Sequence, residues 1–404
     1  MDFRPILSTL RRHKTAAALI VLEVALTCAI VCNAVFLIGS RIERMGAQTG
    51  LAEAELLRIQ LAGIGNGGNA DVVTRQDLIS LRALAGVKGA AIVNQVPFGT
   101  SSSNTSINLA PDQKTATLQV SLYMADEALV DAMGLRLIEG RNFLPAEVQP
   151  QSITEREGEL KLPAVLLTKS TAERLFPGKS AVGQVIYSLG ESPTRVVGVV
   201  EQLAPPRPLD RSEQHAIILP LVPSHRSGSF LVRVDPSQRT QVLKAAVDAL
   251  ERNDSRRIVL RQERLEDMRE AYYQQDRWMA GLLVAVCVAL LVVTAFGIVG
   301  LASFWVQQRT RMIGVRRALG ASRSQILQYF QAENFLLTSI GIALGMIGAF
   351  GINQLMMSHY ELPRLPWQML PIGALSLWTL GQIAVLGPAL RAAALPPVVV
   401  MRGA

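Results

Sequence analysis

The chain has 404 residues, half of them hydrophobic, a mean hydropathy of +0.28 and a formal net charge of +8. A positive mean hydropathy excludes an ordinary set of soluble domains. The excess positive charge lies in three short segments, residues 1–14, 307–332 and 389–404. This distribution gives no support to nucleic-acid binding, for which we would expect a basic surface on a folded domain.

Four apolar stretches are long enough to cross a membrane. Glu23 is their only charged residue, and each reaches the roughly 20 residues that span about 30 Å of hydrocarbon. We predict transmembrane helices at residues 16–39, 279–305, 334–357 and 369–390. A cleaved signal peptide is the alternative for the first, but its apolar run is long for a signal peptide and no clear cleavage site follows.

Lysine and arginine residues in short loops set the orientation of a membrane protein. The three basic segments predict that both termini and the loop Arg309–Phe330 are cytoplasmic. Residues 41–277 and the short loop 358–368 then lie on the outer side. The chain is therefore expected to consist of a first span (1–40), an outer domain (41–277) and a second membrane region (278–404).

The outer domain is predicted to be mixed α/β, because runs of β-branched residues alternate with segments of helical spacing. Expected strands are at residues 90–98, 117–124, 163–168, 194–203, 216–222, 229–234 and 257–263, and expected helices at 126–134, 169–178, 236–254 and 265–278. The Gly- and Ser-rich stretches 63–69 and 99–106 are expected to be turns or mobile loops, with a ligand loop as the alternative.

No motif for catalysis is found. Cys28, Cys32 and Cys287 lie in predicted membrane helices, and the first two are one helical turn apart, so they either pack as small residues or offer two ligands of an incomplete metal site. "PGKSAVG" (177–183) resembles part of a phosphate-binding loop, but Glu173 stands where that loop requires glycine. We therefore expect no catalytic residue and no metal site.

Two features of the predicted membrane helices suggest contacts between helices. Gly341, Gly345 and Gly348 provide small surfaces where another helix could approach closely, within the chain or across a dimer. Glu23 is an intramembrane acid, so it is either a hydrogen-bonded interface residue or part of a proton relay.

The chain resembles the permease subunits of MacB/FtsX-type ABC transporters, the mechanotransmission family, over nearly its whole length. The similarity is carried by four motifs in the family's order: "SLYMADEALVDAMGLRLIEGRNF" (121–143), "LLTKSTAERLFPGKSAVGQVI" with "RVVGVVEQL" (166–203), "RTRMIGVRRALGASRSQI" (309–326) and "GPALRAAALPPVVVMRG" (387–403). The resemblance implies an outer domain of two subdomains, the second at about 115–205 inserted in the first. It also implies a bacterial inner-membrane location.

The same resemblance implies that residues 309–330 form a cytoplasmic coupling helix that docks on an ATPase. On residues alone, the alternative is an interfacial amphipathic helix in contact with membrane lipid. The residues expected to couple are Met312, Ile313, Gly314, Val315, Arg316, Arg317, Ala318, Leu319, Gly320 and Ala321. Met312 departs from the family pattern, which usually has glutamate there; the loss of this charge puts one contact with the ATPase in doubt and is compatible with the less regular half of a heterodimer.

The partners implied are a dimer of cytoplasmic ABC ATPases, which would bind ATP and Mg²⁺, and a second permease, identical or homologous. A periplasmic adaptor and an outer-membrane channel are further partners that such a transporter can have. No cofactor is expected in this chain itself. The expected function is export of a drug, peptide or lipid-like substrate; the alternative is a non-transporting signalling or scaffold protein that controls a periplasmic cell-wall enzyme.

Overall fold

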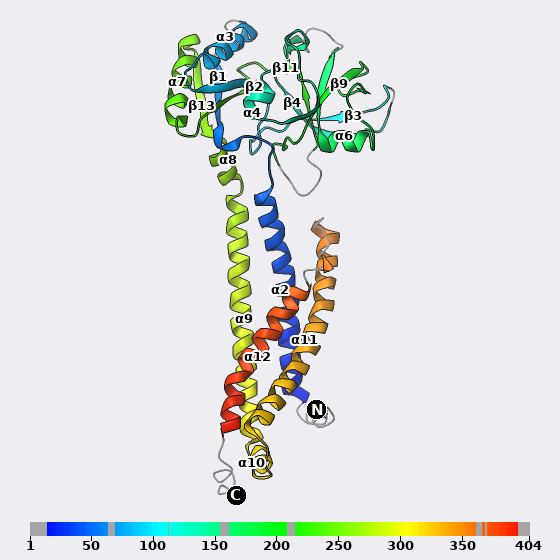
Figure 1. Cartoon of the computed structure of the whole chain (residues 1–404), viewed down its shortest axis with the longest axis vertical. Helices are drawn as coiled ribbons and strands as arrows, with labels where there is room; N and C mark the ends of the chain where they lie inside the picture. The colour runs from blue at the N-terminus through cyan, green and yellow to red at the C-terminus, as the bar shows by residue number, and fades with distance from the viewer. Residues whose placement is uncertain are drawn as a thin grey trace. The chain divides into compact units, whose positions relative to one another are not determined.

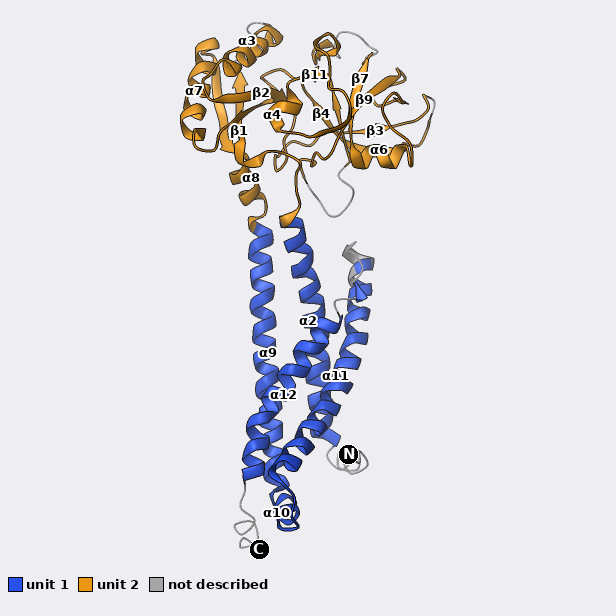
Figure 2. Cartoon of the chain, viewed as in Figure 1, with its two compact units in different colours: residues 1–45, 275–404 blue, residues 46–274 orange. Residues whose placement is uncertain are grey.

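The computed structural model describes residues 14–63, 69–111, 113–153, 161–207, 215–360, 366–367 and 370–394. The chain divides into a membrane unit, residues 1–45 and 275–404, and an α/β unit, residues 46–274 (Figures 1 and 2). The α/β unit is thus inserted between the first and second long helices. The boundaries between the two units lie at 45/46 and 274/275, a few residues from the boundaries expected from the sequence.

Among the residues that the structure describes, the membrane unit contains four helices that are long and apolar enough to span a bilayer, which confirms the predicted number and order of spans. Each predicted span coincides with one of them, although every helix extends further than its apolar core. The described helices of this unit are α2 (Lys14–Gly46), α9 (Gln274–Gln308), the short α10 (Thr310–Ala318), α11 (Arg323–Tyr360) and α12 (Leu370–Ala394).

The four long helices share one apolar core, to which each contributes buried side chains such as Val24, Ile298, Leu337 and Leu377. A few polar contacts join the helices across this core. Thr27 on α2 and Thr294 on α9 form a hydrogen bond of 2.8 Å, and Asn33 on α2 donates to the carbonyl of Ala349 on α11 at 3.2 Å. Trp378 Nε1 on α12 donates to Ser339 Oγ on α11 at 3.0 Å. Arg41 and Asp276 form an ion pair between α2 and the first turn of α9.

The first sheet of the α/β unit is antiparallel and has the strand order β13-β1-β12-β2. Helices α3 and α7 pack on it, and their buried apolar residues share one core with the strands. The amphipathic spacing of α7 buries Val242, Ala246 and Leu250, as the sequence predicts. The elements of this layer are β1 (Leu56–Gly63), α3 (Ala70–Arg82), β2 (Val87–Val93), β12 (Ser229–Val234), α7 (Arg239–Asn253), β13 (Arg257–Arg264) and α8 (Leu265–Tyr272), with the short helix η1 (Glu53–Glu55) before β1.

The second sheet is mixed and has the strand order β3-β4-β10-β7-β9-β5, with β8 paired to β9. Its inner strands are almost completely buried, which explains their continuous apolar sequences. Its elements are β3 (Asn104–Ile107), β4 (Leu118–Met124), α4 (Leu129–Met133), β5 (Leu137–Gly140), β7 (Ala164–Thr168), α6 (Lys169–Leu175), β8 (Val185–Ile186), β9 (Thr194–Val200) and β10 (Ala216–Leu219). A small parallel pair, β6 (Gln149–Pro150) and β11 (Leu221–Val222), and the helix η2 (Pro145–Glu147) complete the unit.

The structure corrects several details of the sequence prediction. Residues 104–107 form a strand, although 99–106 was expected to be irregular throughout, because Asn104–Ile107 pairs with β4. The strands of the second sheet run from residue 104 to 219, so this layer is wider than the range 115–205. Residues 64–68 of the glycine-rich stretch lie outside the described residues, as do residues 1–13, 395–404 and most of the loop 358–368.

Candidate coupling site

The basic segment that follows α9 is the part of the membrane unit that the sequence singled out. The sequence predicts one helix over 309–330, and this is wrong: α10 ends at Ala318, and α11 begins at Arg323 and continues through the third span. The segment is therefore a helix, a tight turn and the start of a second helix. The end of α10 and the beginning of α11 each have a local structural cause.

The stop is a Schellman motif at the end of α10. The amide of Gly320 donates to the carbonyl of Arg317 at 3.1 Å, and the amide of Ala321 donates to the carbonyl of Arg316 at 3.0 Å. This arrangement places Gly320 at φ +95°, in the left-handed region that glycine occupies without a steric penalty. Gly320 therefore ends the helix.

The start of α11 is a capping box. Gln325 Oε1 accepts from the amide of Ser322 at 2.9 Å, and Ser322 Oγ accepts from the amide of Gln325 at 3.2 Å. The sequence Ser-Arg-Ser-Gln thus satisfies two backbone donors at the new helix end. Because stop and start are adjacent, the chain reverses within four residues, 319–322, and α10 with this turn forms a compact tip, which we call the α10 tip (residues 310–322).

Side chains on the α10 tip separate into a buried face and an exposed apolar face. Ile313 and Gly314 are buried. Met312, Val315 and Leu319 are 39%, 48% and 83% exposed. Their spacing of three and four residues places them on one face of the helix. The exposed apolar stripe therefore includes Met312, the position at which the resemblance implies a glutamate.

Arg309 joins the base of the tip to α11 through a buried ion pair. Its Nη1 donates to both carboxylate oxygens of Glu333, at 3.0 and 2.7 Å. The two side chains are only 6% and 1% exposed, so this pair is shielded from water and from salt. The guanidinium also lies over the ring of Trp305 on α9, 5.5 Å from its centroid.

Two further arginines attach the tip to its neighbours. Arg316 lies over the ring of Tyr329 on α11, 4.9 Å from its centroid, and Arg317 Nη1 donates to the carbonyl of Ala393 on α12 at 2.9 Å. Arg311 and Arg323 remain exposed. The α10 tip is thus covalently continuous with α9 and α11 and is bonded to α11 and α12. The tip is therefore attached to three membrane helices, α9, α11 and α12.

The sequence reasoning missed part of this site and misplaced another part. Ile313 was expected to contact the ATPase, but it belongs to the apolar core of the chain itself, together with Ile326 and Phe330. Glu333 was not singled out, although it is the only acid between Asp276 and Glu361. That isolation in an apolar region was the signal that could have identified it as the partner of Arg309.

The glycines singled out on α11 face α2. A Cβ added at Gly341 would lie 2.8 Å from Val24 Cβ, and one at Gly345 would lie 2.5 Å from Cys28 Cβ. At Gly348 the nearest contact would be 3.6 Å, an ordinary packing distance. The structure therefore places Gly341 and Gly345 at a close helix approach within the chain.

The sequence also singled out Glu23, Cys28, Cys32 and the segment 177–183, whose positions in the structure are as follows. Glu23 is half-buried on α2 and lies directly against Gly297 of α9, one turn from the hydrogen bond between Thr27 and Thr294. The sulfur atoms of Cys28 and Cys32 are 3.9 Å apart. In the part of the chain that the structure describes, no group of three or more His, Cys, Asp or Glu side chains could hold a metal ion. Lys179 lies in the turn that follows α6.

These observations define the class of the protein: a multi-pass membrane protein with a mixed α/β unit inserted between its first two spans. Residues 284–397 match the family model of the FtsX-like permease C-terminal domain, and residues 18–250 match that of the MacB-like periplasmic core domain. The chain belongs to this MacB/FtsX family of ABC transporter permeases. Membership and the four apolar helices indicate a multi-pass protein of the inner membrane.

Several relatives are similar to the chain. The macrolide export ATP-binding/permease protein MacB of Chromobacterium violaceum is 28% identical over 283 residues, 66% of this chain and 40% of the relative. MacB of Acinetobacter baylyi is 26% identical over 63% of this chain and 37% of the relative, so the chain spans about two fifths of these MacB proteins. The uncharacterized ABC transporter permease YknZ of Bacillus subtilis is 24% identical over 85% of this chain and 82% of the relative. The periplasmic region of MacB from Actinobacillus actinomycetemcomitans, a solved structure, covers 57% of this chain and 97% of its own at 16% identity and a TM-score of 0.34.

Proposed function

We propose that this chain is the permease subunit of an ATP-driven exporter, and that the α10 tip is the surface on which a cytoplasmic ATPase docks. The observation that supports this most is the exposed stripe of Met312, Val315 and Leu319 on a tip whose base is fixed by buried contacts. An apolar stripe left in water costs free energy, and a groove on a partner would remove that cost. In this interface Met312 replaces the charge that the family usually has with one more apolar contact.

The contacts of the α10 tip allow it to transmit a displacement to the membrane helices. Its backbone is held by the Schellman motif and the capping box, and Arg309, Arg316 and Arg317 tie it to its neighbours. When the ATPase subunits bind ATP with Mg²⁺ and close, they displace the tip, and α9, α11 and α12 move with it. Helices α2 and α9 continue in sequence into the α/β unit, so this motion reaches the periplasmic side without a substrate passing between the helices.

The proposal includes an orientation and a set of partners. Both termini and the α10 tip face the cytoplasm, and the α/β unit faces the periplasm, as the basic segments predict. The active assembly contains two ATPase subunits and a second permease, identical or homologous, with a periplasmic adaptor and an outer-membrane channel as further partners. ATP hydrolysis takes place in the ATPase and not in this chain. The cargo is a drug, peptide or lipid-like molecule, in agreement with the macrolide export named for the MacB relatives.

Co-purification tests the docking surface. The chain is purified from its native membrane and the amount of ABC ATPase that accompanies it is measured for wild type and for Leu319→Asp. The introduced carboxylate would be buried without a partner at the interface, at a cost of more than about 1–3 kcal/mol, so recovery of the ATPase should fall at least tenfold. The matched control is Gln328→Asp, which adds the same charge at an exposed position of α11 away from the stripe and should leave recovery unchanged. Equal recovery with both variants would refute docking at the tip.

A further inference from the structure

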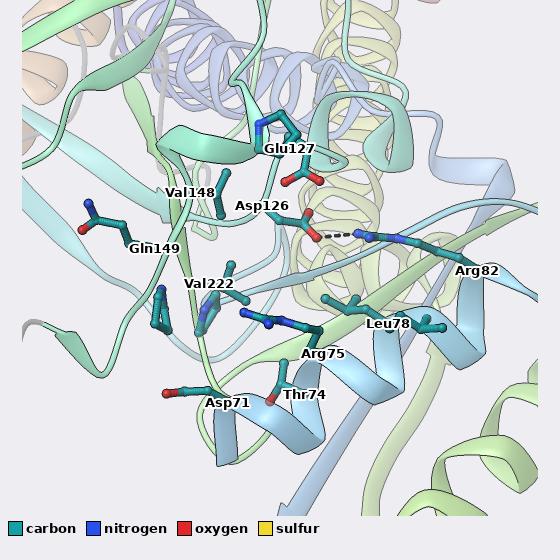
Figure 3. A pocket seen from close by; sticks show the side chains of 14 residues that line it. Asp71, Thr74, Arg75, Leu78, Arg82, Asp126, Glu127, Val148, Gln149 and Val222 are labelled. Carbon is teal, nitrogen blue, oxygen red and sulfur yellow. Dashed lines mark hydrogen bonds and ion pairs between the residues drawn. The ribbon is translucent and has the colours of Figure 1, made fainter. Parts of the chain in front are cut away.

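A cavity in the α/β unit lies outside the coupling site and has no role in the proposed ATPase contact. It measures about 280 Å³ and lies between α3, which packs on the first sheet, and elements attached to the second sheet (Figure 3). Its lining carries five charged side chains: Asp71, Arg75, Arg82, Asp126 and Glu127.

The two walls of the cavity are held in place by polar contacts between the layers. Arg82 at the end of α3 forms an ion pair with Asp126, which follows β4. Asn94, which follows β2, pairs with the backbone of β4: its Nδ2 donates to Leu122 O at 2.8 Å, and its Oδ1 accepts from the amide of Met124 at 2.8 Å. Burial raises the pKa of Asp126, although Arg82 beside it acts in the opposite direction. The junction is therefore a fixed and partly dry site.

Three charged side chains of the cavity are not part of its ion pair: Arg75 is positive, and Asp71 and Glu127 are negative. Arg82 and Asp126 neutralise each other, and Asp71, which keeps its charge, accepts a hydrogen bond from Ser152 Oγ at 2.6 Å. Among the residues that the structure describes, the side chains of Arg75 and Glu127 form no ion pair or hydrogen bond. Figure 3 shows Arg75 extending from α3 and Glu127 across the cavity from it, with Val148 and Val222 lining the space beside them.

This arrangement selects a class of ligand. An anion alone would approach Arg75 but would be repelled by Asp71 and Glu127, and a cation alone would approach those carboxylates but would be repelled by Arg75. A small zwitterion can satisfy both, with its carboxylate on Arg75, its ammonium group on Glu127 and its apolar part against Leu78, Val148 and Val222. The cavity is slightly smaller than the 300–1,000 Å³ usual for drug-sized ligands, which limits the occupant to a few residues at most.

We propose that this cavity binds a free amino acid or a short peptide with unblocked ends. Such a ligand touches both layers of the α/β unit at once, so its binding joins them more tightly. The proposal does not depend on docking of the ATPase at the α10 tip.

Isothermal titration of the full-length chain in lipid nanodiscs tests the proposal with two probes, L-leucine and L-alanyl-L-leucine. Saturable binding of at least one probe is expected, and the stronger one shows whether the site accepts an amino acid or a dipeptide. N-acetyl-L-leucine amide has the same apolar part but no charged ends, and should bind at least tenfold more weakly. No saturation with either probe up to about 10 mM, or equal binding of the blocked compound, overturns the proposal.

Two variants and two controls assign the binding to this cavity. Arg75→Gln and Glu127→Gln each remove one recognition charge and should each weaken binding at least tenfold. The controls Arg195→Gln and Glu191→Gln make the same charge changes at exposed positions outside the cavity and should bind as wild type does. If the cavity variants bind the probes as well as their controls do, the ligand lies elsewhere and the proposal is wrong.

Discussion

The buried ion pair at the base of the α10 tip allows the sharpest test of how the tip is anchored. Replacing Arg309 by Met leaves the carboxylate of Glu333, 1% exposed, without its partner, and replacing Glu333 by Leu leaves the guanidinium of Arg309, 6% exposed, in the same condition. Breaking a buried pair from one side costs about 3–5 kcal/mol, whereas replacing both partners by apolar residues of similar size is about neutral.

The double variant Arg309→Met/Glu333→Leu should therefore be close to wild type, and the interaction energy of the cycle should be about 3 kcal/mol or more. The assay is the free energy of unfolding in mixed micelles, measured by titration with SDS for wild type, both single variants and the double variant. Arg311→Met is the matched control, because Arg311 is exposed on the same helix, and its effect should stay within about 0.5 kcal/mol. If Arg309→Met is no more harmful than Arg311→Met, or if the single effects simply add, the pair does not anchor the tip.

Three further predictions follow from other parts of the structure. Gly345→Leu should disrupt the packing of α11 on α2 and lower the yield of folded protein in size-exclusion chromatography, whereas Gly351→Leu, where an added Cβ meets nothing within 4 Å, should not; equal yields would reject the close approach. Single cysteines at Ser103 and Ser324 should label oppositely with an impermeant reagent in intact cells, Ser103 from outside and Ser324 only after lysis; labelling of Ser324 from outside would contradict the orientation. Burial lowers the pKa of His225, with Arg257 acting in the same direction and Asp77 in the opposite one, so the folded state binds this proton less readily than the unfolded state does. The free energy of unfolding should therefore fall as the pH drops below about 6.5, and this fall should be smaller in His225→Asn; an unchanged slope would show that another group is responsible.

The four membrane spans could be predicted because each depends only on the apolar composition of a long segment of sequence. A run of about 20 uncharged residues has few alternatives to a membrane span, and all four such runs became helices. The buried strands β7, β9 and β12 could also be predicted, because their sequences are rich in β-branched residues. The strand β3 was missed because its sequence, Asn-Thr-Ser-Ile, is mostly polar, and its pairing with β4 determines its conformation.

The coupling segment shows the limit of reading periodicity alone. The apolar residues from Ile313 to Phe330 were read as one helix, but Gly320 and the Ser322–Gln325 pair end it and start another. Both signals are present in the sequence, but they lie inside a motif that the resemblance implies to be a single helix. The contact of Arg309 with Glu333 could not be deduced from spacing, because it depends on how α9 and α11 pack.

The central claim is that the α10 tip couples this chain to an ATPase, and the ATPase rate of the reconstituted pair tests it most directly. The chain in nanodiscs should hydrolyse no ATP by itself, and it should change the rate of its partner ATPase when the two are mixed. Ala318→Glu places a carboxylate on the exposed side of the tip, where docking would bury it without a partner, and should abolish that change. If the variant alters the rate of the ATPase as fully as wild type does, the tip is only a surface anchor and the account of coupling is wrong.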